Sequence, residues 1–121
     1  MTKILFAAAE LTPLAKSGGL ADVVGALPIV LRQRGFDVRC IIPKYEVINA
    51  AALGFRRTRT LSVTVGEGTY AVPLWEGRVP KTDVPAYLLE SPDFLSRGGI
   101  YFEQSIDEKT FAEFRRFLFF Q

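Results

Sequence analysis

Hydrophobic residues near the start of the chain first form a continuous run and then recur at a helical spacing. The run Ile4-Leu5-Phe6-Ala7-Ala8-Ala9 has the length and apolar character of a fully buried parallel strand. Further on, apolar side chains three and four positions apart are expected to share one helix face: Leu20, Val23, Val24, Leu27, Val30 and Leu31. Gly35 is a natural end for this helix. The pattern therefore predicts a strand, a turn and a helix, in that order.

Further segments are expected after this helix. Residues 37–42 predict a second strand, which would complete a parallel β-α-β unit with the first. Residues 46–53 indicate a short helix, and residues 84–89 indicate another buried strand that leads into a polar, glycine-rich loop over 91–99. A cluster of basic side chains is expected on a surface: Arg56, Arg57 and Arg59.

Two alternating segments predict a β-hairpin. Apolar and polar residues alternate over 61–65 and again over 70–75, on either side of the turn Gly66-Glu67-Gly68. Pro73 favours an edge position for the second strand, because proline has no N–H to donate to a neighbour. Together these elements predict an α/β fold, a Rossmann-like parallel sheet with a β-hairpin.

The run Lys16-Ser17-Gly18-Gly19-Leu20 lies between the first strand and the helix. Glycines here allow unusual φ/ψ values and let a ligand approach the backbone N–H groups, which lie at the positive end of the helix dipole. Lys16 adds a mobile positive charge, so the turn is suited to a phosphate. A tight strand-to-helix connection with a solvated lysine is the alternative interpretation. Neither of the familiar patterns G-x-x-x-x-G-K-[ST] and G-x-G-x-x-G is present.

Composition excludes several classes of function. The 121 residues form at most one domain, and a formal net charge of +2 is too small to indicate nucleic acid or an anionic membrane as a partner. Cys40 is the only cysteine and histidine is absent, which argues against a disulfide framework, a zinc site and a nucleophile–histidine pair. No segment has the length of a transmembrane helix. These features predict a cytoplasmic protein without a metal site.

Several motifs resemble one family. Residues 3–10 and 13–28 are similar to the N-terminus of bacterial glycogen synthases and plant starch synthases, whose signature is K-[TSV]-G-G-L-x-D-V-x-x-x-L-P. Shorter stretches resemble the same family further along the chain: Arg34-Gly35-Phe36-Asp37-Val38-Arg39, Ile42-Pro43-Lys44-Tyr45, Arg97-Gly98-Gly99-Ile100-Tyr101 and Arg116-Phe117-Leu118-Phe119-Phe120.

The resemblance implies the GT-B architecture, in which two Rossmann-like domains enclose the active site. Residues 1–121 would be a truncated N-terminal portion of the catalytic domain, with the C-terminal Rossmann-like domain absent. The implied reaction transfers glucose from ADP-glucose to the non-reducing end of an α-1,4-glucan with retention of configuration, without a metal or other cofactor. The catalytic groups are expected outside this chain, which alone would be inactive. The choice between ADP- and UDP-glucose stays open.

The resemblance also implies roles for residues near the glycine turn. Lys16, Gly18 and Gly19 match the family's lysine and glycine loop, which binds the donor phosphates. Asp22 matches an aspartate that receives sugar hydroxyls, although a carboxylate in the first helical turn is also favoured by the helix dipole.

Two further side chains are weaker candidates for sugar or acceptor binding. Tyr101 could offer its ring and hydroxyl to the acceptor glucan, or fold onto the core as an ordinary loop aromatic. Glu10 follows the first strand, where open α/β sheets place ligand groups, and it could equally orient Lys16.

A helix starting near Asp107 is expected to carry an apolar, mainly aromatic cluster up to the last residue, Gln121: Phe111, Phe114, Phe117, Leu118, Phe119 and Phe120. An apolar edge at Phe119 and Phe120 would promote self-association and favours truncation of a longer domain. A non-catalytic nucleotide- or glucan-binding remnant remains the alternative function. A flavodoxin-like or receiver domain is disfavoured, because the hairpin interrupts the alternation of strands and helices.

Overall fold

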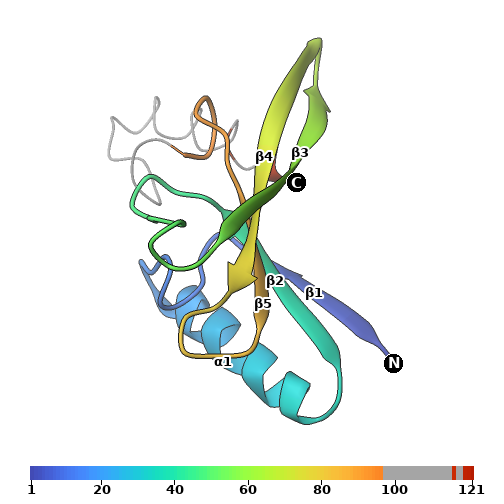
Figure 1. Cartoon of the computed structure of the whole chain (residues 1–121), viewed down its shortest axis with the longest axis vertical. Coiled ribbons are helices and arrows are strands. Elements are labelled where there is room, and N and C mark those ends of the chain that lie inside the picture. Colours follow the sequence, from blue (N-terminus) through green and yellow to red (C-terminus); the bar gives the residue numbers. More distant parts are fainter. Residues whose placement is uncertain (97–115, 117–118) are drawn as a thin grey trace.

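The computed structural model describes residues 1–96, 116 and 119–121. Five strands form one mixed sheet in the order β1-β2-β5-β4-β3, with β1, β2 and β5 parallel and β5, β4 and β3 antiparallel. The elements are β1 (Lys3–Ala7), α1 (Gly19–Gln33), β2 (Asp37–Pro43), β3 (Arg56–Val65), β4 (Gly68–Arg78) and β5 (Pro85–Leu89). Helix α1 lies alongside the parallel strands, and the β3–β4 hairpin extends away from it (Figure 1). The predicted α/β fold with a hairpin is confirmed.

Helix α1 ends where the sequence predicts. Gly35 follows the C-cap residue Arg34 and has a φ of +92°, a left-handed conformation that glycine adopts without strain. Its N–H donates to the carbonyl of Arg32, and the N–H of Phe36 donates to that of Leu31. These are the two hydrogen bonds of a Schellman motif, so the helix end is specified locally.

The face that α1 turns to the sheet differs from the predicted apolar face. The buried helical residues are Ala21, Val24 and Pro28, and a Cβ on Gly25 would lie 3.0 Å from the carbonyl oxygen of Thr12. Small residues therefore set the contact, because they let the helix backbone approach its neighbours. Four members of the predicted face are between 43% and 58% exposed: Leu20, Val23, Leu27 and Val30.

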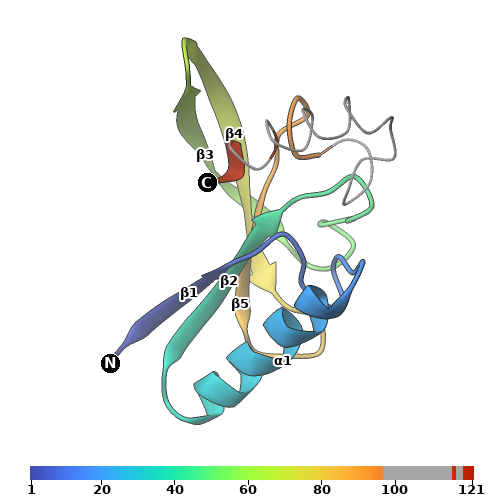
Figure 2. The ribbon, with the colours of Figure 1, turned by 180° about the vertical axis from the view of Figure 1, so that it is seen from behind.

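Strand β1 is not fully buried, contrary to the prediction. It is the edge strand of the sheet and pairs only with β2 among the described residues. Leu5 is 58% exposed, whereas Phe6 and Ala8 pack against the core. A strand with one neighbour and one covered face can bury only alternate side chains. Figure 2 shows β1 at the margin of the sheet, beyond β2.

The hairpin forms as predicted but is longer and lies elsewhere in the sheet. Strand β4 sits between β3 and β5, so the edge position predicted from Pro73 is wrong. Pairing with β5 begins only at Leu74, and the carbonyl of Pro73 accepts the N–H of Glu90 just beyond that ladder. The missing donor of Pro73 therefore falls where pairing with β5 has ended. The three arginines lie exposed on β3, as expected.

The helix predicted over residues 46–53 is absent, because successive turns occupy this segment. The side-chain oxygen of Asn49 accepts the N–H of Ala52, and Gly54 reverses the chain with a φ of +84°. Asparagine side chains compete with helical hydrogen bonding, and the left-handed glycine ends any helix after a single turn.

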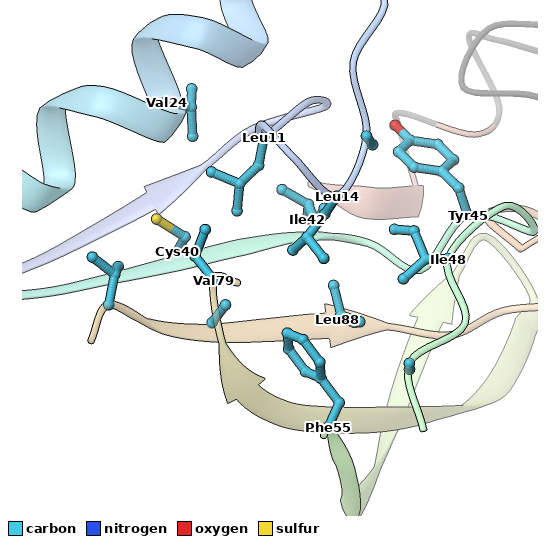
Figure 3. Packing of buried hydrophobic residues seen from close by; sticks show 14 residues of the cluster. Leu11, Leu14, Val24, Cys40, Ile42, Tyr45, Ile48, Phe55, Val79 and Leu88 are labelled. Atoms are coloured by element: carbon cyan, nitrogen blue, oxygen red, sulfur yellow. The ribbon is translucent and has the colours of Figure 1, made fainter. Parts of the chain in front are cut away.

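A cluster of buried side chains fills the space between α1, the parallel strands and the loops after them (Figure 3). Cys40 is fully buried on β2, and burial raises the pKa of its thiol to about 11. The largest contributors include Leu11, Ile42, Tyr45, Phe55 and Leu88. Of the described residues, no helix has both the length and the hydropathy needed to cross a bilayer.

Phe119 belongs to a second buried cluster and is not an exposed edge. It is only 5% exposed, its ring stacks on Phe94 with centroids 4.4 Å apart, and Tyr70 meets both rings edge-on. Phe120 is half-buried beside them. Phe119 is therefore not available for the self-association expected through this edge. The other aromatic residues of the predicted terminal helix, at positions 111–118, lie outside the described residues.

Candidate anion-binding site at the start of helix α1

The segment between β1 and α1 is anchored in the core before it reaches the glycine turn. Leu11 and Ala15 exchange two backbone hydrogen bonds, of 3.0 and 2.9 Å, and both are buried. The N–H of Thr12 donates to the carbonyl of Ala21 in the first turns of α1. Residues 16–20 are exposed above this base. The glycine turn is therefore a solvent-facing loop on a fixed support.

Neither glycine of the turn is required by its backbone conformation. Gly18, the N-cap of α1, is extended with φ −158° and ψ −159°, and Gly19 has no positive φ. A Cβ on either residue would meet no heavy atom within 4 Å. The unusual φ/ψ values anticipated from the sequence are therefore not present. What the glycines provide is open space at the positive end of a 15-residue helix.

Glu10 lies beneath this loop and receives hydrogen bonds from it. Its side chain is buried, with only 3% of the residue exposed, and its Oε2 accepts the N–H groups of Ser17 at 3.2 Å and Gly18 at 3.1 Å. The N–H of Gly18 is thus directed to a carboxylate of the chain itself. The next N–H, that of Gly19, has no acceptor in the part of the chain that the structure describes.

Lys16 and Asp22 form an ion pair across the mouth of the loop. Lys16 Nζ lies 2.9 Å from Oδ1 and 3.0 Å from Oδ2 of Asp22, which also accepts the hydroxyl of Thr12 at 3.1 Å. The hydrogen bond from Lys16, followed by that from Thr12, lowers the pKa of Asp22 below 3.8. Asp22 is therefore ionised at neutral pH. Both side chains are about half exposed (54% and 55%), so an incoming anion can compete for the lysine.

Five of the six predicted site residues converge on this loop and the first turn of α1: Glu10, Lys16, Gly18, Gly19 and Asp22. Tyr101 lies outside the described residues. No group of three cysteine or acidic side chains within residues 1–96, 116 and 119–121 could hold a metal ion.

Tyr45, to which the sequence pattern assigned no role, supports the site from below. Its side chain is fully buried and its hydroxyl donates to the carbonyl of Ala9 at 2.6 Å, directly before Glu10. The guanidinium carbon of Arg116 lies 5.3 Å from the centre of the Tyr45 ring. Both residues belong to motifs that resemble the synthase family, which was the only signal the sequence offered.

Comparison with known proteins shows which family the sequence of this chain resembles. Residues 3–121 match the model of the starch synthase catalytic domain. Glycogen synthase 1 of Geobacter metallireducens is 45% identical over 101 residues, which cover 82% of this chain and 20% of that protein. Glycogen synthase of Syntrophotalea carbinolica is 42% identical over 118 residues, or 97% of this chain and 24% of that protein.

A solved structure agrees with these sequence relatives. The catalytic domain of starch synthase IV from Arabidopsis thaliana, bound to ADP and acarbose, superimposes with a TM-score of 0.79 and 31% sequence identity. The match covers 98% of this chain and 23% of that one. The chain thus spans a fifth to a quarter of the length of these relatives. It belongs to the starch synthase catalytic-domain family.

Proposed function

We propose that the chain is part of a retaining glucosyltransferase that moves glucose from ADP-glucose to the non-reducing end of an α-1,4-glucan. The observation that carries this proposal is the open N-terminus of α1 beside Lys16, in a chain whose structural neighbour is bound to ADP. Residues 1–121 would form the first portion of the N-terminal domain of a GT-B enzyme. A cytoplasmic location belongs to the same proposal, since the one cysteine is free.

The loop supplies what a departing nucleoside diphosphate needs. As the bond between the anomeric carbon and the phosphate oxygen breaks, negative charge develops on ADP. Lys16 and the N–H of Gly19, at the positive end of the α1 dipole, would stabilise that charge. Gly18 contributes the empty space above its Cα, which allows a phosphate oxygen to come close to the backbone.

The ion pair between Lys16 and Asp22 gives the site a way to respond to the donor. A phosphate that draws Lys16 away leaves the carboxylate of Asp22 free to accept hydrogen bonds from sugar hydroxyls. Thr12, which also donates to Asp22, would keep that carboxylate in place. Tyr101 remains the candidate contact for the acceptor glucan.

Calorimetric titration of the chain with ADP tests the phosphate role. We expect Lys16→Ala to weaken binding by about tenfold or more, roughly 1.4 kcal/mol, since a full charge leaves the site. Lys3→Ala is the matched control, because it removes the same charge at the opposite end of β1, and its affinity should stay within about twofold of the wild type. Equal losses in both variants, or no binding by a folded wild-type chain, would refute the proposed donor loop.

Binding without transfer is the second candidate function. It is favoured by the loop itself, because Lys16 and the open N-terminus of α1 can hold an anion without any group that performs transfer. Incubation with ADP-[14C]glucose and glycogen separates the two. We expect bound nucleotide but no label in the polymer, and labelled glycogen would show that these residues suffice for transfer.

A further inference from the structure

Among the residues that the structure describes, Glu10 is the one buried acidic side chain in contact with the candidate donor loop. Its Oε2 lies 3.1–3.2 Å from the N–H groups of Ser17 and Gly18, immediately before the first residue of α1. A buried carboxylate is costly unless it is hydrogen-bonded, and these two donors meet part of that need. Without Glu10, the same two N–H groups would be free to donate hydrogen bonds to a phosphate at this position.

The backbone around Glu10 is held on both sides. The carbonyl of Ala9 accepts the hydroxyl of Tyr45 at 2.6 Å, and Leu11 exchanges two backbone hydrogen bonds with Ala15. Leu11 and Ala15 also belong to the hydrophobic core. The carboxylate therefore sits at a fixed place beneath the loop.

We propose that Glu10 is a positioning residue, whose buried carboxylate binds the inner N–H groups of the loop and leaves Gly19 and Lys16 presented to the donor diphosphate. This inference rests on the proposed function and deepens it. A carboxylate that occupies the Ser17 and Gly18 donors acts as an internal anion and fixes the shape of the turn. The ligand then meets an ordered set of donors and does not have to order the loop itself.

This role differs from contact with sugar. Glu10 is 3% exposed and lies under the loop, whereas Asp22 and Lys16 are about half exposed at its mouth. Its effect on the ligand is therefore indirect, through Ser17 and Gly18. Any side chain that offers an acceptor oxygen at the same reach should replace it in part. Glu10→Gln keeps such an acceptor oxygen, whereas Glu10→Ala removes it.

Amide hydrogen exchange of the ligand-free chain is the first arm of the test. We expect Glu10→Ala to accelerate exchange at Ser17 and Gly18 by about tenfold, since each loses a charge-assisted hydrogen bond, and Glu10→Gln to restore most of the protection. Amides of β2 report whether the fold is intact. Glu67→Ala, in the exposed hairpin turn, is the matched control and should leave all these rates unchanged.

ADP titration of the same proteins is the second arm. We expect Glu10→Ala to weaken binding by about tenfold and Glu10→Gln to recover most of it. Unchanged exchange at Ser17 and Gly18 in Glu10→Ala would overturn the inference whatever the affinity. Altered exchange with unaltered affinity would overturn the positioning role, while Lys16→Ala still tests the donor loop. Failure of the wild type to bind ADP would refute the proposed function, and the exchange rates would separately decide whether Glu10 shapes the loop.

Discussion

Replacing Gly19 with alanine separates the reasons for which a glycine can stand at the start of α1. The position has no positive φ, and a Cβ there would meet no heavy atom within 4 Å. Alanine therefore fits without strain. Alanine is favoured over glycine in a helix by up to about 1 kcal/mol, and it also restricts the unfolded chain. Because the site is the first helical residue, we expect a gain of about 0.5 kcal/mol in the free energy of unfolding.

The same methyl group should damage ligand binding. It would occupy the space through which a phosphate oxygen reaches the N–H of Gly19, so we expect the affinity for ADP to fall by about tenfold or more, roughly 1.4 kcal/mol. Urea denaturation followed by circular dichroism gives the stability, and calorimetric titration of the same samples gives the affinity. We therefore expect Gly19→Ala to raise the free energy of unfolding and to lower the affinity for ADP.

Gly35→Ala is the matched control at the other end of the helix. That position is equally open but has a φ of +92°, so alanine should cost about 1 kcal/mol of stability and leave ADP binding unchanged. Loss of stability in Gly19→Ala would refute the conclusion that the space is empty and unstrained. A gain in stability with unchanged ADP affinity would refute the conclusion that a ligand uses that space.

Three other perturbations test the fold around the site. Gly77→Ala would place a Cβ 2.7 Å from ring atoms of buried Phe55, so we expect a loss of about 2 kcal/mol in urea denaturation, and an unchanged midpoint would contradict the packing. Tyr45→Phe removes the hydrogen bond to Ala9 but keeps the ring, which should cost about 1 kcal/mol by the same assay, and equal stability would show that the bond contributes nothing. Burial raises the pKa of Cys40 from 9.0 to about 11, so at pH 8 iodoacetamide should modify the native chain roughly a hundredfold more slowly than the urea-unfolded chain; equal rates would contradict that burial.

Local patterns in the sequence were sufficient to predict much of the secondary structure. The end of α1 at Gly35 and the hairpin around Gly66 depend on neighbouring residues alone, because left-handed glycines and short turns act within a few positions. The motif around Lys16 likewise placed the candidate site at the start of a helix. The helix predicted over residues 46–53 was wrong for a local reason too, since Asn49 and Gly54 favour turns over a helix there despite the apolar content of the segment.

The order of the strands could not be read from the sequence. The pattern of residues 4–9 predicted a buried strand, yet β1 lies at the edge of the sheet. Pro73 predicted an edge position for β4, which lies between β3 and β5. Burial of a strand depends on what pairs with it and what covers its faces, and these partners come from distant parts of the chain. The exposed face of α1 has the same origin, because Gly25 and Ala21 decided which side could approach the loop.

The sequence by itself determined which residues gather at the candidate site, since a strand, a glycine turn and a helix in succession bring Lys16, Gly19 and Asp22 together. Only the tertiary structure decided how their polar groups are used. It buried Glu10 beneath the turn, gave the N–H of Gly18 to that carboxylate and paired Lys16 with Asp22. The physical reason is that hydrogen bonds and ion pairs depend on distances of a few ångströms, which are fixed by packing against Tyr45 and the core and leave no periodic trace in the sequence.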